Sequence, residues 1–111
     1  MALRPITFLG DSLDCLRAFP EDARRHVGYE LYKVQQGLDP SDWKPMSIIG
    51  PGAREIRIRE VGGAYRVLYV AMLEERVYVL NVFQKKSQKT PGRELDLAAH
   101  RLKLLKQRTH R

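Results

Sequence analysis

Residues 53–90, AREIRIREVGGAYRVLYVAMLEERVYVLNVFQKKSQKT, hold three consecutive runs in which apolar side chains alternate with cationic or other polar ones. In the first run, from Arg54 to Glu60, a period of two places Ile56 and Ile58 on one face of a strand. The opposite face carries Glu55, Arg57 and Arg59. This alternation predicts a strand that buries only one of its faces.

Two further runs follow a glycine pair. Gly62-Gly63 predicts a tight hairpin turn, because glycine adopts positive φ values without steric cost. The second run, Tyr65 to Met72, is rich in β-branched and aromatic residues. A turn at Glu74-Glu75 leads to the third run, Arg76 to Lys86, whose nearly continuous apolar character is typical of a central strand. We expect an antiparallel sheet that buries one face and carries arginines and lysines on, or at the rim of, the other.

The chain before this sheet predicts one short strand and two helices. Leu3 to Leu9 alternates weakly, and Pro5 favours an edge position because proline cannot donate to a ladder. A short helix follows Gly10, with an apolar side made by Leu13, Leu16 and Phe19. A longer helix begins at Pro20 and ends near Gly37. Its apolar stripe consists of Ala23, Val27, Leu31, Val34 and Leu38.

A long connection and a final helix flank the sheet. Residues 39–52 contain three prolines and two glycines, which excludes a continuous helix or central strand. Trp43 is expected to anchor this connection at the edge of the core, although it is also able to stack on an RNA base. The same anchoring role is expected of Met46, Ile48 and Ile49. The last helix starts at Pro91, and its stripe is Leu95, Ala98, Leu102 and Leu105.

The expected order of elements is therefore β-α-α-β-β-β-α. This order predicts an α+β fold in which a small, mostly antiparallel sheet is packed by helices. With 111 residues, the chain has room for one hydrophobic core, so we expect residues 1–111 to form a single domain.

The amino-acid composition limits the kinds of molecule that the protein is expected to bind. Twenty lysines and arginines against thirteen acidic residues give a net charge of +7, which attracts polyanions such as RNA or DNA. No lipidation signal or basic amphipathic N-terminal helix indicates a membrane surface. Cys15 is the single cysteine, so an internal disulfide is excluded, and the N-terminus lacks the apolar core of a signal peptide. We expect a cytoplasmic protein without membrane contact.

The common catalytic motifs are absent from this sequence. Without a Cys-x-x-Cys pair or a histidine cluster, no metal site is expected, and no glycine-rich loop suited to a phosphate cofactor precedes a helix. No cofactor is expected. The remaining candidates for catalytic or binding residues are cationic and aromatic, and they lie on or just after the expected sheet: Arg57, Arg59, Arg66, Tyr69, Lys85, Lys86 and Lys89. Such residues form either a positive surface for a polyanion or an ordinary solvated face.

Several of these residues occur in a recognisable pattern. Glu55-x-Arg57 and Tyr65-Arg66-Val67 precede Phe83-x-Lys85-Lys86, and Lys89-Thr90-Pro91 then leads to Glu94 and Ala98 on the last helix. With the order of elements, this pattern resembles the RelE/ParE toxin superfamily, and most closely its phage-derived HigB-like branch. The similarity extends over nearly the whole chain, although the first forty residues match in pattern only.

The resemblance implies the RelE-like fold and the toxin of a type II toxin–antitoxin system. Such a toxin is an mRNA interferase, a ribosome-dependent endoribonuclease that cuts mRNA by 2′-hydroxyl attack without metal, which inhibits translation and arrests growth. The implied partners are the ribosome with its mRNA and a cognate helix-turn-helix antitoxin of the Xre or HigA-like type, with operator DNA bound only through that antitoxin.

The resemblance also implies roles for particular residues. Arg57 and Arg66 would stabilise the phosphate, Lys85 would move a proton, and Tyr69 would transfer a proton or stack. RNA backbone would lie on Arg59, Lys86 and Lys89. Many members of the superfamily carry an active-site histidine or C-terminal tyrosine that this chain lacks, so the general acid and base stay open. Two alternatives also stay open: a ParE-like toxin that inhibits gyrase without cutting RNA, and an RNA-binding module of a phage or mobile element.

Overall fold

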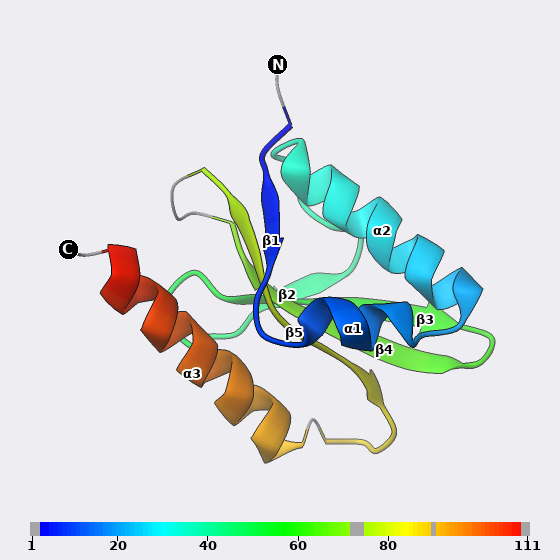
Figure 1. Ribbon diagram of the computed structural model, residues 1–111. Helices are drawn as coiled ribbons and strands as arrows, with labels where there is room; N and C mark the ends of the chain where they lie inside the picture. The colour runs from blue at the N-terminus through cyan, green and yellow to red at the C-terminus, as the bar shows by residue number, and fades with distance from the viewer. Residues whose placement is uncertain (1–2, 72–74, 90, 110–111) are drawn as a thin grey trace.

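The computed structural model describes residues 3–71, 75–89 and 91–109, and it shows a five-stranded sheet with helices on both faces (Figure 1). This architecture confirms the α+β class. Eight elements follow one another along the chain: β1 (Ile6–Phe8), α1 (Ser12–Arg17), α2 (Glu21–Gln35), β2 (Trp43–Pro45), β3 (Arg54–Glu60), β4 (Gly63–Val70), β5 (Val77–Lys85) and α3 (Gly92–Thr109). The seven expected elements are present, and β2 is an additional strand.

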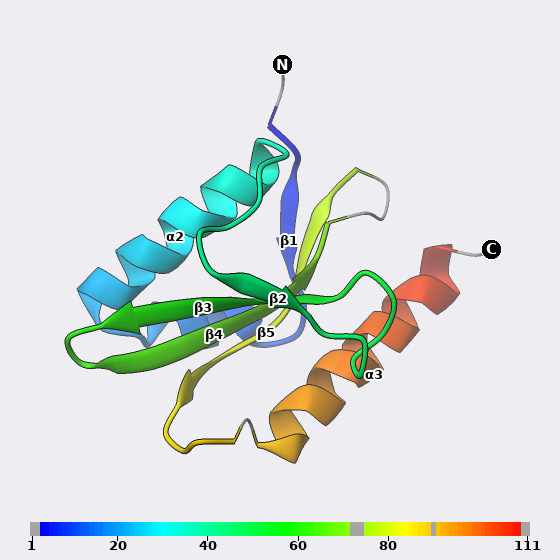
Figure 2. The same cartoon turned by 180° about the vertical axis from the view of Figure 1, so that it is seen from behind.

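The strands lie in the order β1-β5-β4-β3-β2 (Figure 2). β1 runs parallel to β5, and every other neighbouring pair is antiparallel. β5 therefore has β1 on one side and β4 on the other, as expected for the most apolar run. Three residues used in the sequence-based expectations fall outside the described residues. They are Met72, the expected end of the second strand, Glu74, the first residue of the expected turn, and Thr90, the last residue of the sheet-forming stretch.

The hairpin between β3 and β4 has a loop of two residues, Val61 and Gly62, because Glu60 pairs with Gly63. Gly63 opens β4 with φ +151°, and a Cβ there would lie 2.8 Å from Gln84 Nε2. Gly62 has no positive φ, so only one member of the expected glycine pair uses the conformational freedom of glycine.

Helices cover the two faces of the sheet unequally. α1 and α2 pack on one face, where the alternate side chains of β3 and β4 that include Ile56, Ile58 and Val67 join the stripe of α2. α3 packs on the opposite face against Leu68, Leu80 and other residues of β4 and β5 (Figure 1). The expectation of one buried and one open face was therefore too simple. Only the part of the second face that α3 leaves uncovered is available for binding.

β5 contains one extra residue relative to β4. Leu68 pairs with Asn81, whereas the next residue of β4, Tyr69, pairs with Val79, so Leu80 forms a bulge. A bulge shifts the two-residue alternation by one position. As a result, Leu80 and Phe83 both belong to the cluster under α3, although three positions separate them.

The connection between α2 and β3 is anchored in part as expected. Met46 and Ile49 are buried, whereas Ile48 is 75% exposed because it lies on the outer side of the turn at residues 47–49. Leu38, which follows the end of α2, is also exposed. The Trp43 ring packs on the Arg54 guanidinium, 4.0 Å from the ring centroid. This contact holds β2 against β3 at the edge of the sheet.

Within the described residues, no helix combines the length and the apolar character needed to cross a membrane.

Candidate cationic site on the sheet

The pairing of β3, β4 and β5 brings four cationic residues onto one face. Arg57 pairs with Arg66, which pairs with Phe83, and in the next row Arg59 and Lys85 stand on either side of Ala64. Since Phe83 belongs to the cluster under α3, these two rows lie on the α3 side of the sheet. The bulge at Leu80 is needed for this arrangement, because it places Lys85 on the same face as Arg66.

A buried carboxylate lies at the centre of the site. Glu55 is 2% exposed, and its Oε1 lies 3.5 Å from Arg57 Nε, 3.7 Å from Arg66 Nε and 3.9 Å from Lys44 Nζ. One negative charge thus faces three positive ones. The carboxylate fixes the two arginines side by side, and the group keeps a net positive charge that suits a phosphate.

Arg66 is the deepest of these cations. Its side chain is 10% exposed, its Nη1 donates to the Tyr65 carbonyl at 3.0 Å, and its buried Nε has no hydrogen-bond partner among the described residues. Burial, the largest cause, lowers the pKa of Arg66. The Glu55 carboxylate acts in the opposite direction, and Arg57 and Arg59 add to the lowering. Glu55 therefore provides the main compensation for burying this guanidinium.

The remaining cations are more accessible. The Arg57 side chain is 39% exposed and also lies 3.8 Å from Asp42 Oδ1. Lys85 is half-buried at the end of β5, and Arg59, Lys86 and Lys89 are exposed. In the part of the chain that the structure describes, no acidic side chain pairs with any of these last four. They are available to an anionic ligand.

Tyr69 does not join the other predicted site residues. It is fully buried under α2, on the face of the sheet opposite Arg66, because the two residues are three positions apart on the same strand. Burial raises the pKa of its hydroxyl, and the neighbouring Arg54 guanidinium offsets part of that effect. The position of Tyr69 explains its role in packing and gives it no contact with the cationic face.

Two residues of the site escaped the sequence analysis. The sequence places Glu55 on the same face of its strand as Arg57 and Arg59. An acidic residue between cations on one face is a signal for an ion pair, and this signal could have identified Glu55 as part of the site. Lys44 gave no signal, because the strand that carries it was expected to be a loop.

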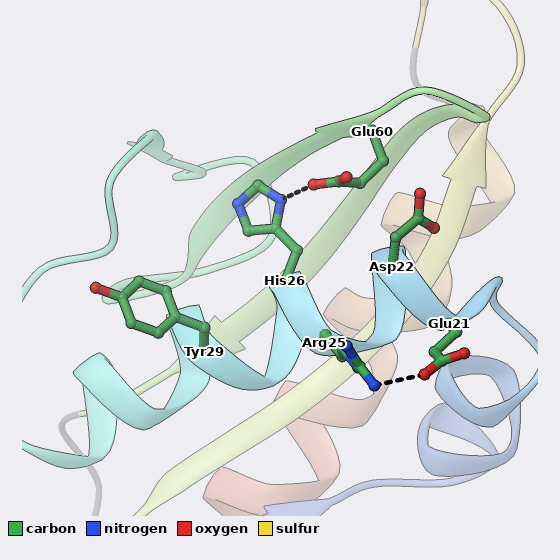
Figure 3. Close-up of a pocket in the computed structure, with 6 residues that line it drawn as sticks. All are labelled: Glu21, Asp22, Arg25, His26, Tyr29 and Glu60. Atoms are coloured by element: carbon green, nitrogen blue, oxygen red, sulfur yellow. Dashed lines mark hydrogen bonds and ion pairs between the residues drawn. The ribbon is translucent and has the colours of Figure 1, made fainter.

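A second polar cluster lies on the opposite face of the sheet, between α2 and the end of β3. His26 Nδ1 is 2.7 Å from Glu60 Oε2, and Arg25 pairs with Glu21 at 2.6 Å (Figure 3). Asp22 and Tyr29 complete the lining of this shallow pocket. With three carboxylates, this surface is unfavourable for a polyanion and is distinct from the cationic face.

Over residues 3–71, 75–89 and 91–109, no group of three or more histidine, cysteine, aspartate or glutamate side chains is arranged to hold a metal ion.

The described residues adopt a RelE-like fold. The structure of an arginine-to-alanine double mutant of the E. coli toxin RelE in the free state is similar, with a TM-score of 0.61 and 18% sequence identity. The similarity covers 95% of this chain and 99% of that one. At this identity the likeness establishes the fold alone.

A family model gives the more specific assignment. The model described as phage-derived protein Gp49-like matches residues 14–103, and the chain belongs to this family. No curated protein matches the sequence.

Proposed function

We propose that this chain is the toxin of a type II toxin–antitoxin system and acts as an mRNA interferase, which cuts mRNA on the ribosome without a metal ion. The observation that carries the proposal is the pair Arg57 and Arg66, held together by buried Glu55 on the open part of the sheet. Arg59 and Lys85 flank this pair in the next row. The RelE-like fold and the Gp49-like family support the same conclusion.

The chemistry requires positive charge at the scissile phosphate. The ribose 2′-oxygen attacks phosphorus as its proton leaves to water, the bond to the 5′-oxygen breaks, and that oxygen gains a proton. The products are a 2′,3′-cyclic phosphate and a 5′-hydroxyl. Arg57 is accessible enough to contact the phosphate directly, and Arg66 supplies positive charge from beneath. Fixed cations of this kind stabilise the charge that develops in the transition state.

Lys85 is assigned the transfer of a proton to the departing 5′-oxygen. It lies in the row next to the arginines, and no acidic partner among the described residues neutralises its ammonium group. Glu55 is a positioning residue in this proposal, since its carboxylate is almost completely buried. Arg59, Lys86 and Lys89 contact the RNA backbone on both sides of the cut, where exposed cations release counterions on binding.

The proposed partners follow from the same activity. They are the ribosome with its mRNA and a small helix-turn-helix antitoxin encoded beside this chain, through which operator DNA is bound. A cytoplasmic location accompanies this proposal.

Primer extension on mRNA from cells that express the chain tests the activity. We expect growth arrest with new 5′ ends, and we expect both to disappear in the double variant Arg57→Ala with Lys85→Ala. The double variant Arg24→Ala with Lys103→Ala is a matched control, because it removes two exposed cations on helices away from the site. Arrest with intact mRNA would overturn the proposal, and DNA breaks in place of mRNA cleavage would indicate a gyrase inhibitor.

A further inference from the structure

A groove borders the cationic site at the outer edge of β5. β1 pairs with β5 only at Val77–Val79, so the rest of β5 has no strand neighbour on that side within the described residues. α1 and the first turns of α3 lie on either side of this part of β5 (Figure 1). The groove between them has a volume of about 640 Å³. Its lining includes Cys15, Phe19, Asn81, Phe83, Glu94 and Leu97.

The groove is continuous with the arginine pair through Phe83. This ring lies in the same cross-strand row as Arg57 and Arg66, and it also lines the groove. Neighbouring strands are about 4.8 Å apart, so the row places β5 about 10 Å from the strand that carries Arg57. A nucleotide adjacent to a phosphate held by the arginines is long enough to reach across this distance.

The lining carries two carboxylates, Asp11 and Glu94, and one cation, Arg93, so its charge favours a base over a phosphate. The walls are mostly apolar, as in pockets that hold flat organic groups, and a few fixed polar atoms are present. Asn81 Nδ2 donates to Glu94 Oε1 at 3.0 Å and to the Glu94 carbonyl at 3.2 Å, which fixes the carboxylate at the start of α3. A carboxylate repels phosphate but accepts hydrogen bonds from the amino groups of bases.

We propose that this groove is a subsite for one base of the RNA next to the cut, and that Glu94 selects a base with an exocyclic amino group over uracil. The inference rests on the proposed function, because it takes RNA as the ligand of the arginine pair. Adenine, cytosine and guanine each present such an amino donor to the carboxylate. Uracil presents an N–H between two carbonyl oxygens, and those oxygens face the carboxylate unfavourably.

The variant Glu94→Gln separates recognition from anchoring. Its amide oxygen still accepts the hydrogen bond from Asn81, so α3 stays attached to β5. Its amide nitrogen adds a donor in place of an acceptor, which weakens the preference for an amino group over a carbonyl oxygen. Asp96→Asn is the matched control, since Asp96 is exposed on the same helix and does not line the groove.

The experiment sequences the cleavage products of a ribosome-bound message library randomised around the cut. For the unchanged chain and for Asp96→Asn, we expect about tenfold less cutting when uracil occupies one fixed position, a ratio typical of a single base contact. For Glu94→Gln, we expect messages with uracil at that position to be cut almost as well as messages with the other bases. Ala18→Trp, which fills the groove from an exposed position, is expected to lower kcat/KM on messages with the preferred base.

The two proposals fail in different ways. If the unchanged chain cuts the library and Glu94→Gln leaves its base preference unaltered, the subsite is refuted while the nuclease activity stands. If the unchanged chain cuts none of the messages, the proposed function is overturned, and this inference with it.

Discussion

Replacing Glu55 by glutamine tests whether the cationic site depends on its buried carboxylate. The change leaves three cations within 4 Å of an uncharged amide. Lys44 and Arg57 are solvated, with 47% and 39% of their side chains exposed, so their loss of a partner costs little. Arg66 is 10% exposed, and a buried charge that loses its partner costs about 3–5 kcal/mol. We expect Glu55→Gln to destabilise the fold by about 3 kcal/mol, the lower end of that range.

Urea unfolding measures this value. We expect the midpoint to fall and the slope with denaturant to stay constant, because the folded state keeps its compactness. Adding Arg66→Met to Glu55→Gln should restore part of the stability, since the second change removes the unpaired buried charge. A loss below about 1 kcal/mol for Glu55→Gln, or a double variant no more stable than the single one, would refute the electrostatic reasoning.

Three further predictions concern charge and packing. Arg59→Ala should weaken RNA binding at low salt and reduce the slope of log affinity against log salt by about one, as measured by a salt titration of RNA binding; an unchanged slope would remove Arg59 from the RNA contact. Glu30 is buried and accepts from the Ser41 N–H at 2.6 Å and the Ser41 hydroxyl at 3.0 Å. Glu30→Ala should therefore lower the free energy of unfolding by about 1–3 kcal/mol in urea, and an unaltered midpoint would contradict this. The Arg101 guanidinium, 2.7 Å from Asp11 Oδ1, lowers the pKa of Asp11 below 3.8, so this pair adds stability above that pH and loses it as the pH falls through the lowered value. Asp11→Asn should remove that part of the acid dependence of thermal unfolding, and identical pH profiles would exclude the linkage.

Local patterns predicted most of the sheet. Arg54 to Glu60 was predicted with the bounds that the structure shows, because strict alternation between two turns leaves little freedom of register. The same rule could have excluded Tyr69, since residues three positions apart on one strand face opposite sides. The aromatic ring of Tyr69 suggests a site residue, but its odd spacing from Arg66 along the strand places it on the other face.

The remaining features depend on contacts that no local pattern encodes. β2 has three residues, one of them proline, and it forms because β3 offers an edge for pairing. Without that pairing, Lys44 would not lie next to Glu55. The extra residue at Leu80 was also invisible, because β5 is apolar on both faces and shows no alternation from which a shift could be read.

The bulge at Leu80 has a consequence for comparing this chain with its relatives. A relative with the same number of residues in β5 but no bulge at this point would turn its lysine toward α2 and away from the arginines. A relative that lacks one residue here pairs regularly and keeps its lysine on the same face as the arginines. A one-residue deletion at the bulge is therefore compatible with the same arrangement of cations. Residue equivalence along β5 needs to be established separately before and after Leu80, and lysines aligned across a one-residue gap at this point lie on the same face of the sheet.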